Sequence, residues 1–167
     1  MSVNAADPEP APKQTVQDAY LQMHKEMASG NKEKQSKALK AMMPTKKDLE
    51  YLFPKHADKL WPGYEEENKS ILKSVDMVAK EITRRGEVEK IEATDVRKDK
   101  DDSEGRYKRV LAMIPKDVPV FKLLVRKKNS SSGSPPFVYV NKRWILMRGL
   151  DDIPQDIDDL EKKQKSK

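Results

Sequence analysis

Residues 64–96, YEEENKSILKSVDMVAKEITRRGEVEKIEATDV, change their hydrophobic period at Gly86. Between 71 and 82 the apolar residues recur every three or four positions, which predicts one long amphipathic helix over residues 64–85. Glutamates at the start and arginines at the end of this segment complement the helix dipole, and a glycine suits the position just after a helix. After the glycine the period of the apolar residues changes to two, which predicts a first strand over 88–96.

Three shorter helices are expected upstream. The runs Thr15-Val16-Gln17-Asp18 and Thr45-Lys46-Lys47-Asp48 each place a threonine three residues before a carboxylate, which is the pattern of a helix capping box. The first helix is expected to end before Gly30, the second to cover about 31–43, and the third to stop at Pro54. A break is expected at Pro62-Gly63, before the long helix begins.

The segment after the first strand predicts hairpin-connected strands. We expect strands over 107–114, 118–128, 137–140 and 143–147, with a charged hairpin loop at 98–105 and a mobile Ser/Gly/Pro loop at 129–136. On the third strand, Phe121, Leu123 and Val125 form an apolar face that should meet the long helix, while the reverse face is mixed. Helices followed by strands indicate an α+β fold, with N-terminal helices packed on one face of a curved antiparallel sheet of four to five strands.

Length and tail composition suggest one domain. Residues 1–14 are rich in Ala and Pro and are expected to be a disordered tail, residues 15–150 form a single α+β domain, and residues 151–167 form an acidic, then Lys-rich C-terminal tail with a short helix. No stretch approaches the roughly 20 apolar residues of a membrane span. The start of the chain reads either as a cytoplasmic tail or as the mature end of a periplasmic or exported protein whose signal was removed.

Composition excludes several kinds of chemistry. The chain has no cysteine and two histidines, so disulfides, thiolate metal sites and iron–sulfur clusters are excluded. It has no glycine-rich phosphate loop, and the aspartates at 151–159 lack the spacing of a calcium loop. We therefore expect no metal site, no cofactor and no catalytic set that could be named from spacing alone.

The charge makes nucleic-acid binding a weak alternative. There are 34 Lys/Arg against 28 Asp/Glu, and the excess lies between residues 87 and 149. Acids interrupt the basic residues there, whereas a nucleic-acid binder concentrates charge in a stripe with stacking aromatics. The residues that would carry such binding are Arg97, Lys98, Lys100, Arg106, Lys108, Arg109, Arg126, Lys127 and Lys128.

The element order, with the final Val140-Asn141-Lys142-Arg143-Trp144-Ile145 hairpin, resembles the nuclear-transport-factor-2-like (cystatin-like cone) superfamily over residues 15–150. The chain is similar to small bacterial members without an assigned function, although Lys142 stands where the family pattern has glycine. The resemblance implies a cone-shaped space between sheet and helices, used as an active site, a ligand pocket or plain core. It also implies a homodimer through the open sheet face.

The candidate cavity residues are aromatic: Tyr20, Tyr51, Trp61, Tyr64 and Trp144. The leading hypothesis is a non-catalytic binding or protein-interaction module, because few residue types suited to catalysis are present. A small isomerase- or hydratase-like enzyme is the second hypothesis. Such an enzyme would need a shielded carboxylate facing a tyrosine. The further candidates for this acid–base role are Tyr107, Tyr139 and Asp95.

Overall fold

The computed structural model describes residues 11–166. Within them the chain forms seven α-helices, one π-helical turn and five strands. In order they are α1 (Val16–Met27), α2 (Lys32–Met42), α3 (Lys46–Leu52), α4 (Ala57–Lys73), α5 (Val75–Arg84), β1 (Val88–Asp95), the π-helical turn η1 (Asp102–Arg106), α6 (Lys108–Leu111), β2 (Val120–Lys127), β3 (Ser130–Gly133), β4 (Phe137–Val140), β5 (Arg143–Leu146) and α7 (Ile153–Lys165).

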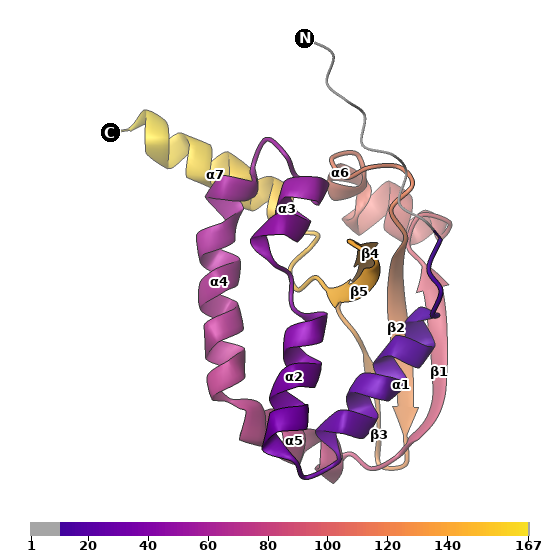
Figure 1. Cartoon of the computed structure of the whole chain (residues 1–167). Helices are drawn as coiled ribbons and strands as arrows, with labels where there is room; N and C mark the ends of the chain where they lie inside the picture. The colour runs from indigo at the N-terminus through magenta and orange to yellow at the C-terminus, as the bar shows by residue number, and fades with distance from the viewer. Residues whose placement is uncertain (1–10, 167) are drawn as a thin grey trace.

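The strands form one open antiparallel sheet, so the α+β class is confirmed. Its order is β1-β2-β4-β5, and β3 pairs with β2 as well. β4 pairs with the start of β2 through Val120 and Phe121, whereas β3 pairs with residues from Leu124 to Lys127. Since β1 occupies one edge of β2, β3 and β4 lie one after the other along its second edge (Figure 1).

Apolar side chains cover both faces of the β4–β5 hairpin. Trp144 and Tyr139 belong to one cluster, whereas the adjacent Ile145 and Val138 belong to another. The α1-side core comprises Val16, Ala19, Leu123, Val125, Phe137, Tyr139 and Trp144. The α3-side core includes Leu49, Leu52, Leu60, Val110, Val138, Val140, Ile145, Ile153 and Ile157. The hairpin is therefore the central layer of the molecule, between α1 on one side and α3, α4, α6 and α7 on the other.

The prediction of one helix over 64–85 with a break at Pro62-Gly63 is wrong. α4 begins at Ala57 and continues through Pro62, which removes only one backbone donor from a helix held by its neighbours. The break lies at Ser74, whose backbone is outside the helical region (φ −103°, ψ 17°). The Ser74 hydroxyl donates to the carbonyl of Ser70 at 3.2 Å, a local bond that competes with helix continuation.

The predicted strand over 107–114 and the charged hairpin loop before it are also wrong. The chain forms the π-helical turn η1 and then α6 in this region. Tyr107, Val110 and Ile114 are buried and lie three and four residues apart, a spacing that follows one face of a helix and breaks the alternation of a strand. The loop expected at 129–136 contains the short strand β3, which turns back directly onto β2.

The packing of the helices differs from expectation too. The apolar face of β2, with Leu123 and Val125, meets α1 and not α4 or α5. α5 packs on α1 and α2 instead.

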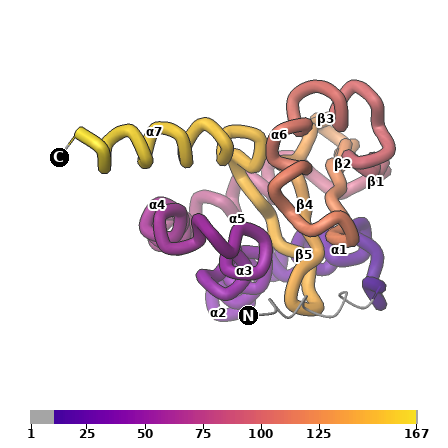
Figure 2. The backbone as a smooth tube through the Cα atoms, turned by 90° about the horizontal axis from the view of Figure 1, so that it is seen from above, coloured from indigo at the N-terminus to yellow at the C-terminus, as the bar shows by residue number. Residues whose placement is uncertain are grey.

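The C-terminal tail forms the 13-residue helix α7, which buries Ile153 and Ile157 and then extends away from the body of the molecule (Figure 2). In the described residues, no helix is both long enough and apolar enough to cross a bilayer.

Candidate functional site

A groove of about 640 Å³ lies between α1, α2 and the β4–β5 hairpin. We call it the α1–α2 groove. Its apolar lining consists of Ala19, Met23, Ala38, Ala41, Met42, Tyr139 and Trp144, and its polar lining of Lys13, Gln14, Gln22, Glu26, Lys142 and Arg143; Ala11 completes it. This volume falls within the range typical of ligand sites, roughly 300–1,000 Å³.

Helical periodicity explains how the two walls arise. The α1 wall consists of residues 19, 22, 23 and 26, and the α2 wall of residues 38, 41 and 42. Both sets follow spacings of three and four, so each is one stripe along its helix. Thr15 and Asn31 fix the starts of the two helices by accepting bonds from backbone N–H groups in the first turn. The result is a trough along two helices.

The floor of the groove is held in place by aromatic contacts. Trp144 is 6% exposed, and its ring meets Tyr139 at 5.3 Å and Phe121 at 5.8 Å between centroids, both edge to face. The Trp144 Nε1–H donates to the carbonyl of Gln14 at 2.9 Å. This bond ties the segment before α1 across one end of the groove. Of the residues 1–14 that were expected to form a disordered tail, Ala11, Lys13 and Gln14 line this groove, and residues 1–10 lie outside the described part.

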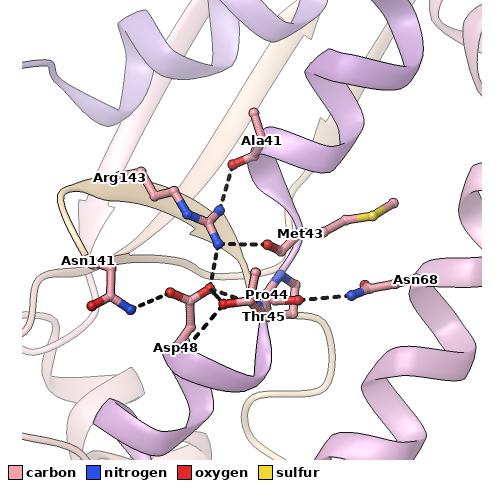
Figure 3. A network of polar contacts seen from close by, with 8 residues as sticks. All are labelled: Ala41, Met43, Pro44, Thr45, Asp48, Asn68, Asn141 and Arg143. Carbon is pink, nitrogen blue, oxygen red and sulfur yellow. Dashed lines mark hydrogen bonds and ion pairs between the residues drawn. The ribbon is translucent and has the colours of Figure 1, made fainter.

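A polar network fixes the same end of the groove (Figure 3). Arg143 donates to the carbonyls of Ala41 at 2.7 Å and Met43 at 3.1 Å, which are otherwise unpaired acceptors at the end of α2. Its guanidinium also forms an ion pair with Asp48, which is 1% exposed. The hairpin is thereby locked to the junction between α2 and α3.

Asp48 joins three segments of the chain. Its Oδ2 accepts from the backbone N–H of Thr45 at 2.8 Å and from the Thr45 hydroxyl at 2.9 Å, which confirms the predicted capping box. Its Oδ1 accepts from Asn141 Nδ2 at 2.7 Å. Asn68 on α4 donates to the carbonyl of Pro44 at 2.9 Å and extends the network to a fourth element (Figure 3).

The turn of the hairpin carries an unusual residue. Asn141 (φ 49°) and Lys142 (φ 64°) both adopt the left-handed conformation that a tight two-residue hairpin turn requires. Lys142 adopts this left-handed conformation although it is not a glycine. The turn is anchored by the contacts of Asn141 and Arg143. The predicted tight hairpin is confirmed.

Charge is distributed unequally along the groove. Lys13, Lys142 and Arg143 lie at the hairpin end, beside the start of α1 and the end of α2. Glu26 lies seven residues further along α1 than Ala19, a distance of about 10 Å on a helix. Glu26 accepts a hydrogen bond from Gln22 at 2.9 Å. Lys13 and Lys142 therefore make the hairpin end of the trough cationic beside the Asp48-paired Arg143, and Glu26 makes the other end acidic.

The structure does not bring the five predicted cavity residues together. Trp144 lines the groove, whereas Tyr20 faces the sheet from α1 and contacts Phe137 edge to face. Tyr51 and Trp61 pack against the α3-side core. Tyr64 donates its hydroxyl to the carbonyl of Arg148 at 3.2 Å in a separate depression between α4 and α7, and burial raises its pKa above the ordinary 10.0.

The further candidates for acid–base chemistry are dispersed as well. Tyr139 lines the groove, but Tyr107 is a member of the α3-side core, where burial raises its pKa. Asp95 pairs with Lys98 and accepts from the backbone N–H of Arg97. In the described part of the groove lining, Glu26 is the one carboxylate. Within residues 11–166, no group of three or more His, Asp or Glu side chains could hold a metal ion.

Acids or backbone carbonyls engage most of the basic residues considered for nucleic-acid binding. Arg126 pairs with Glu92, Arg106 with Asp151, and Arg109 with Asp158. Lys98 and Lys100 also have acidic partners, and Arg97 donates to the carbonyls of Pro115 and Val118. The open face of β1 and β2 likewise alternates charge around Leu124, which is 37% exposed.

Sequence reasoning missed the α1 and α2 walls. Ala19, Met23 and Met42 look like ordinary core positions, and both helices are short. The available signal was that α1 has apolar residues on two sides, one toward the sheet and one toward α2.

Comparisons with protein-family models, curated proteins and solved structures found no match to this chain.

Proposed function

We propose that this protein is a non-catalytic interaction module whose α1–α2 groove binds an amphipathic helix of a partner protein. The observation that carries the proposal is the trough itself: an apolar floor between two helical stripes, cationic at one end and acidic at the other. Grooves of this kind accept helices whose apolar residues recur at i, i+3, i+4 and i+7.

The side-chain types suit this occupant. Ala19, Ala38 and Ala41 are small, so the backbone of a bound helix can approach closely. Met23 and Met42 are flexible and can repack around different apolar anchors. The groove is partly open, so a helix of a partner can reach these side chains.

The end charges favour one orientation. A helix carries partial positive charge at its N-terminus and partial negative charge at its C-terminus. The C-terminal turn of the partner should therefore lie near Lys142 and Arg143, and its N-terminal turn near Glu26. Glutamates in the last turn of the partner would strengthen that preference.

The likeness to the nuclear-transport-factor-2-like cone and a homodimer through the open sheet face remain predictions beside this proposal. Neither is needed for the groove to bind a helix, because the groove lies on the α1 side of the hairpin and is built from one chain.

A synthetic peptide tests the proposal. It should have leucines at i, i+3, i+4 and i+7 and glutamates in its last turn, with a scrambled peptide of identical composition as the control. Titration is followed by calorimetry and by tryptophan fluorescence, since Trp144 lines the groove. The designed peptide is expected to bind, and the scrambled one to bind at least about tenfold more weakly, a difference of about 1.4 kcal/mol.

A matched pair of variants locates the binding. Ala38→Phe places a ring in the groove and should weaken binding at least about tenfold, a loss of about 1.4 kcal/mol. Lys37→Phe adds the same ring one residue earlier on an exposed position outside the groove and should leave binding unchanged. Equal affinity for both peptides, or equal effects of the two variants, would refute the proposal.

A further inference from the structure

Lys127 is buried without a partner for its charge. The residue is 7% exposed and lies at the end of β2, on the side that Leu123 and Val125 turn toward α1. Within the described residues, its ammonium forms no ion pair or hydrogen bond. A buried lysine is normally paired, because an isolated charge is costly to remove from water.

His24 adds a second unsatisfied group at the same place. It lies one turn after Tyr20 on α1, and the two rings are 6.3 Å apart between centroids. Its Nε2 is buried and has no hydrogen-bond partner in the described part of the protein. Burial and the neighbouring charge of Lys127 lower the pKa of His24.

Arg85 brings a third cationic group from the end of α5. Its charge acts on both Lys127 and Tyr20, and its backbone carbonyl accepts from the N–H of Asn129, two residues after Lys127. The acid that acts on this group is Glu81, and Arg84 and Arg85 already engage its carboxylate. α1 contacts α5, and the residue pair Arg85 and Asn129 links the end of α5 to the turn after β2 (Figure 1).

Lys127 therefore has two nitrogen-bearing neighbours, His24 from α1 and Arg85 from α5, and Glu81 is the carboxylate beside it. Like charges held together in a partly buried place are unfavourable unless an opposite charge joins them. Buried polar groups without partners in a native protein call for a bound water or ion. We propose that His24, Arg85 and Lys127 form a binding site for a small tetrahedral oxyanion, a phosphate group. The site lies outside the α1–α2 groove and does not depend on the function proposed for it.

Calorimetry and thermal unfolding with sulfate and inorganic phosphate test the site, with sodium chloride at the same ionic strength as the reference. Both oxyanions are expected to bind and to raise the unfolding temperature in a saturable way, because a ligand that binds only the folded state stabilises it. Sulfate keeps its charge between about pH 5 and pH 8, so its affinity should rise toward low pH as His24 gains its proton. The groups next to His24 are Tyr20 on α1 and Lys127 on β2; Arg85 and Glu81 on α5 act on Lys127, and Arg85 acts on Tyr20 as well.

Two variants and one control decide the outcome. Lys127→Met leaves an unbranched side chain one atom shorter and should abolish the oxyanion effect, while folding is retained because an unpaired buried charge is removed. His24→Gln should abolish the pH dependence of sulfate binding. Lys128→Met removes the same charge from the adjacent exposed residue and should change little.

The source of the phosphate group is distinguished by a third titration. Phosphoserine that binds more tightly than inorganic phosphate would assign the site to a phosphorylated partner, and weaker binding would assign it to the free anion. Stabilisation no greater than that by chloride, or an unchanged effect in Lys127→Met, would overturn the proposal.

Discussion

The replacement Asp48→Ala tests whether the polar network at the hairpin end holds the fold together. Asp48 is 1% exposed, and the Arg143 side chain with which it pairs is 30% exposed. Breaking a buried ion pair by removing one partner costs about 3–5 kcal/mol, and the partial exposure of Arg143 places this case near the lower end. Loss of the capping box on Thr45 adds about 1 kcal/mol.

The expected loss in the free energy of unfolding is therefore about 4 kcal/mol. For a chain of this size, each kcal/mol lowers the unfolding temperature by about 2–4 °C, so the fall should be roughly 8–16 °C. Urea unfolding followed by circular dichroism measures the free energy, and scanning calorimetry measures the temperature. If the alanine variant does not fold, Asp48→Asn retains the shape of the side chain and gives the same comparison.

A double-mutant cycle separates the pair from its surroundings. Arg143→Met and the double variant complete the cycle, and we expect a coupling energy of about 2 kcal/mol. The exposed pair of Glu92 and Arg126 is the control, and its cycle should show no measurable coupling. Additivity at Asp48 and Arg143 within about 0.5 kcal/mol would refute the reasoning.

Three further changes probe other features of the chain. Gly86→Ala should lower the free energy of unfolding by about 1–2 kcal/mol in urea, because Gly86 has φ +83° and a Cβ there would lie 3.3 Å from that of Lys128; an unchanged midpoint would contradict the left-handed geometry. Lys142→Gly should raise the free energy of unfolding in urea by about 1 kcal/mol, because the backbone angle φ of 64° at this position suits glycine. A loss of stability would instead show that the lysine side chain holds the turn. In oxyanion-free buffer, the free energy of unfolding should fall as pH drops below 6.5, the ordinary pKa of histidine, because the unfolded chain protonates His24 more readily than the folded protein does. His24→Phe should flatten that pH dependence and Lys127→Met should weaken it; a profile identical to that of the unmodified protein would show that His24 is not the group responsible.

Tertiary packing decided several features that local sequence patterns did not. The expected strand over 107–114 overlooked that Tyr107, Val110 and Ile114 recur at helical spacing, and all three are buried in the α3-side core. Tyr20 and Trp144 are both aromatic and apolar in sequence, yet one packs toward the sheet and the other lines the groove. Pro62 was a plausible helix break, but the contacts of α4 with α3 and α7 carry the helix through it.

The sequence by itself determined the features that depend on neighbours within about four residues: the caps at Thr15 and Thr45, the change of period at Gly86 and the tight hairpin at Asn141. The tertiary structure alone decided which face of each element is covered, where the groove opens, and that Asp48 meets Arg143. Those two residues are 95 positions apart in the chain. No local periodicity can specify such a contact, because it depends on how every intervening element packs.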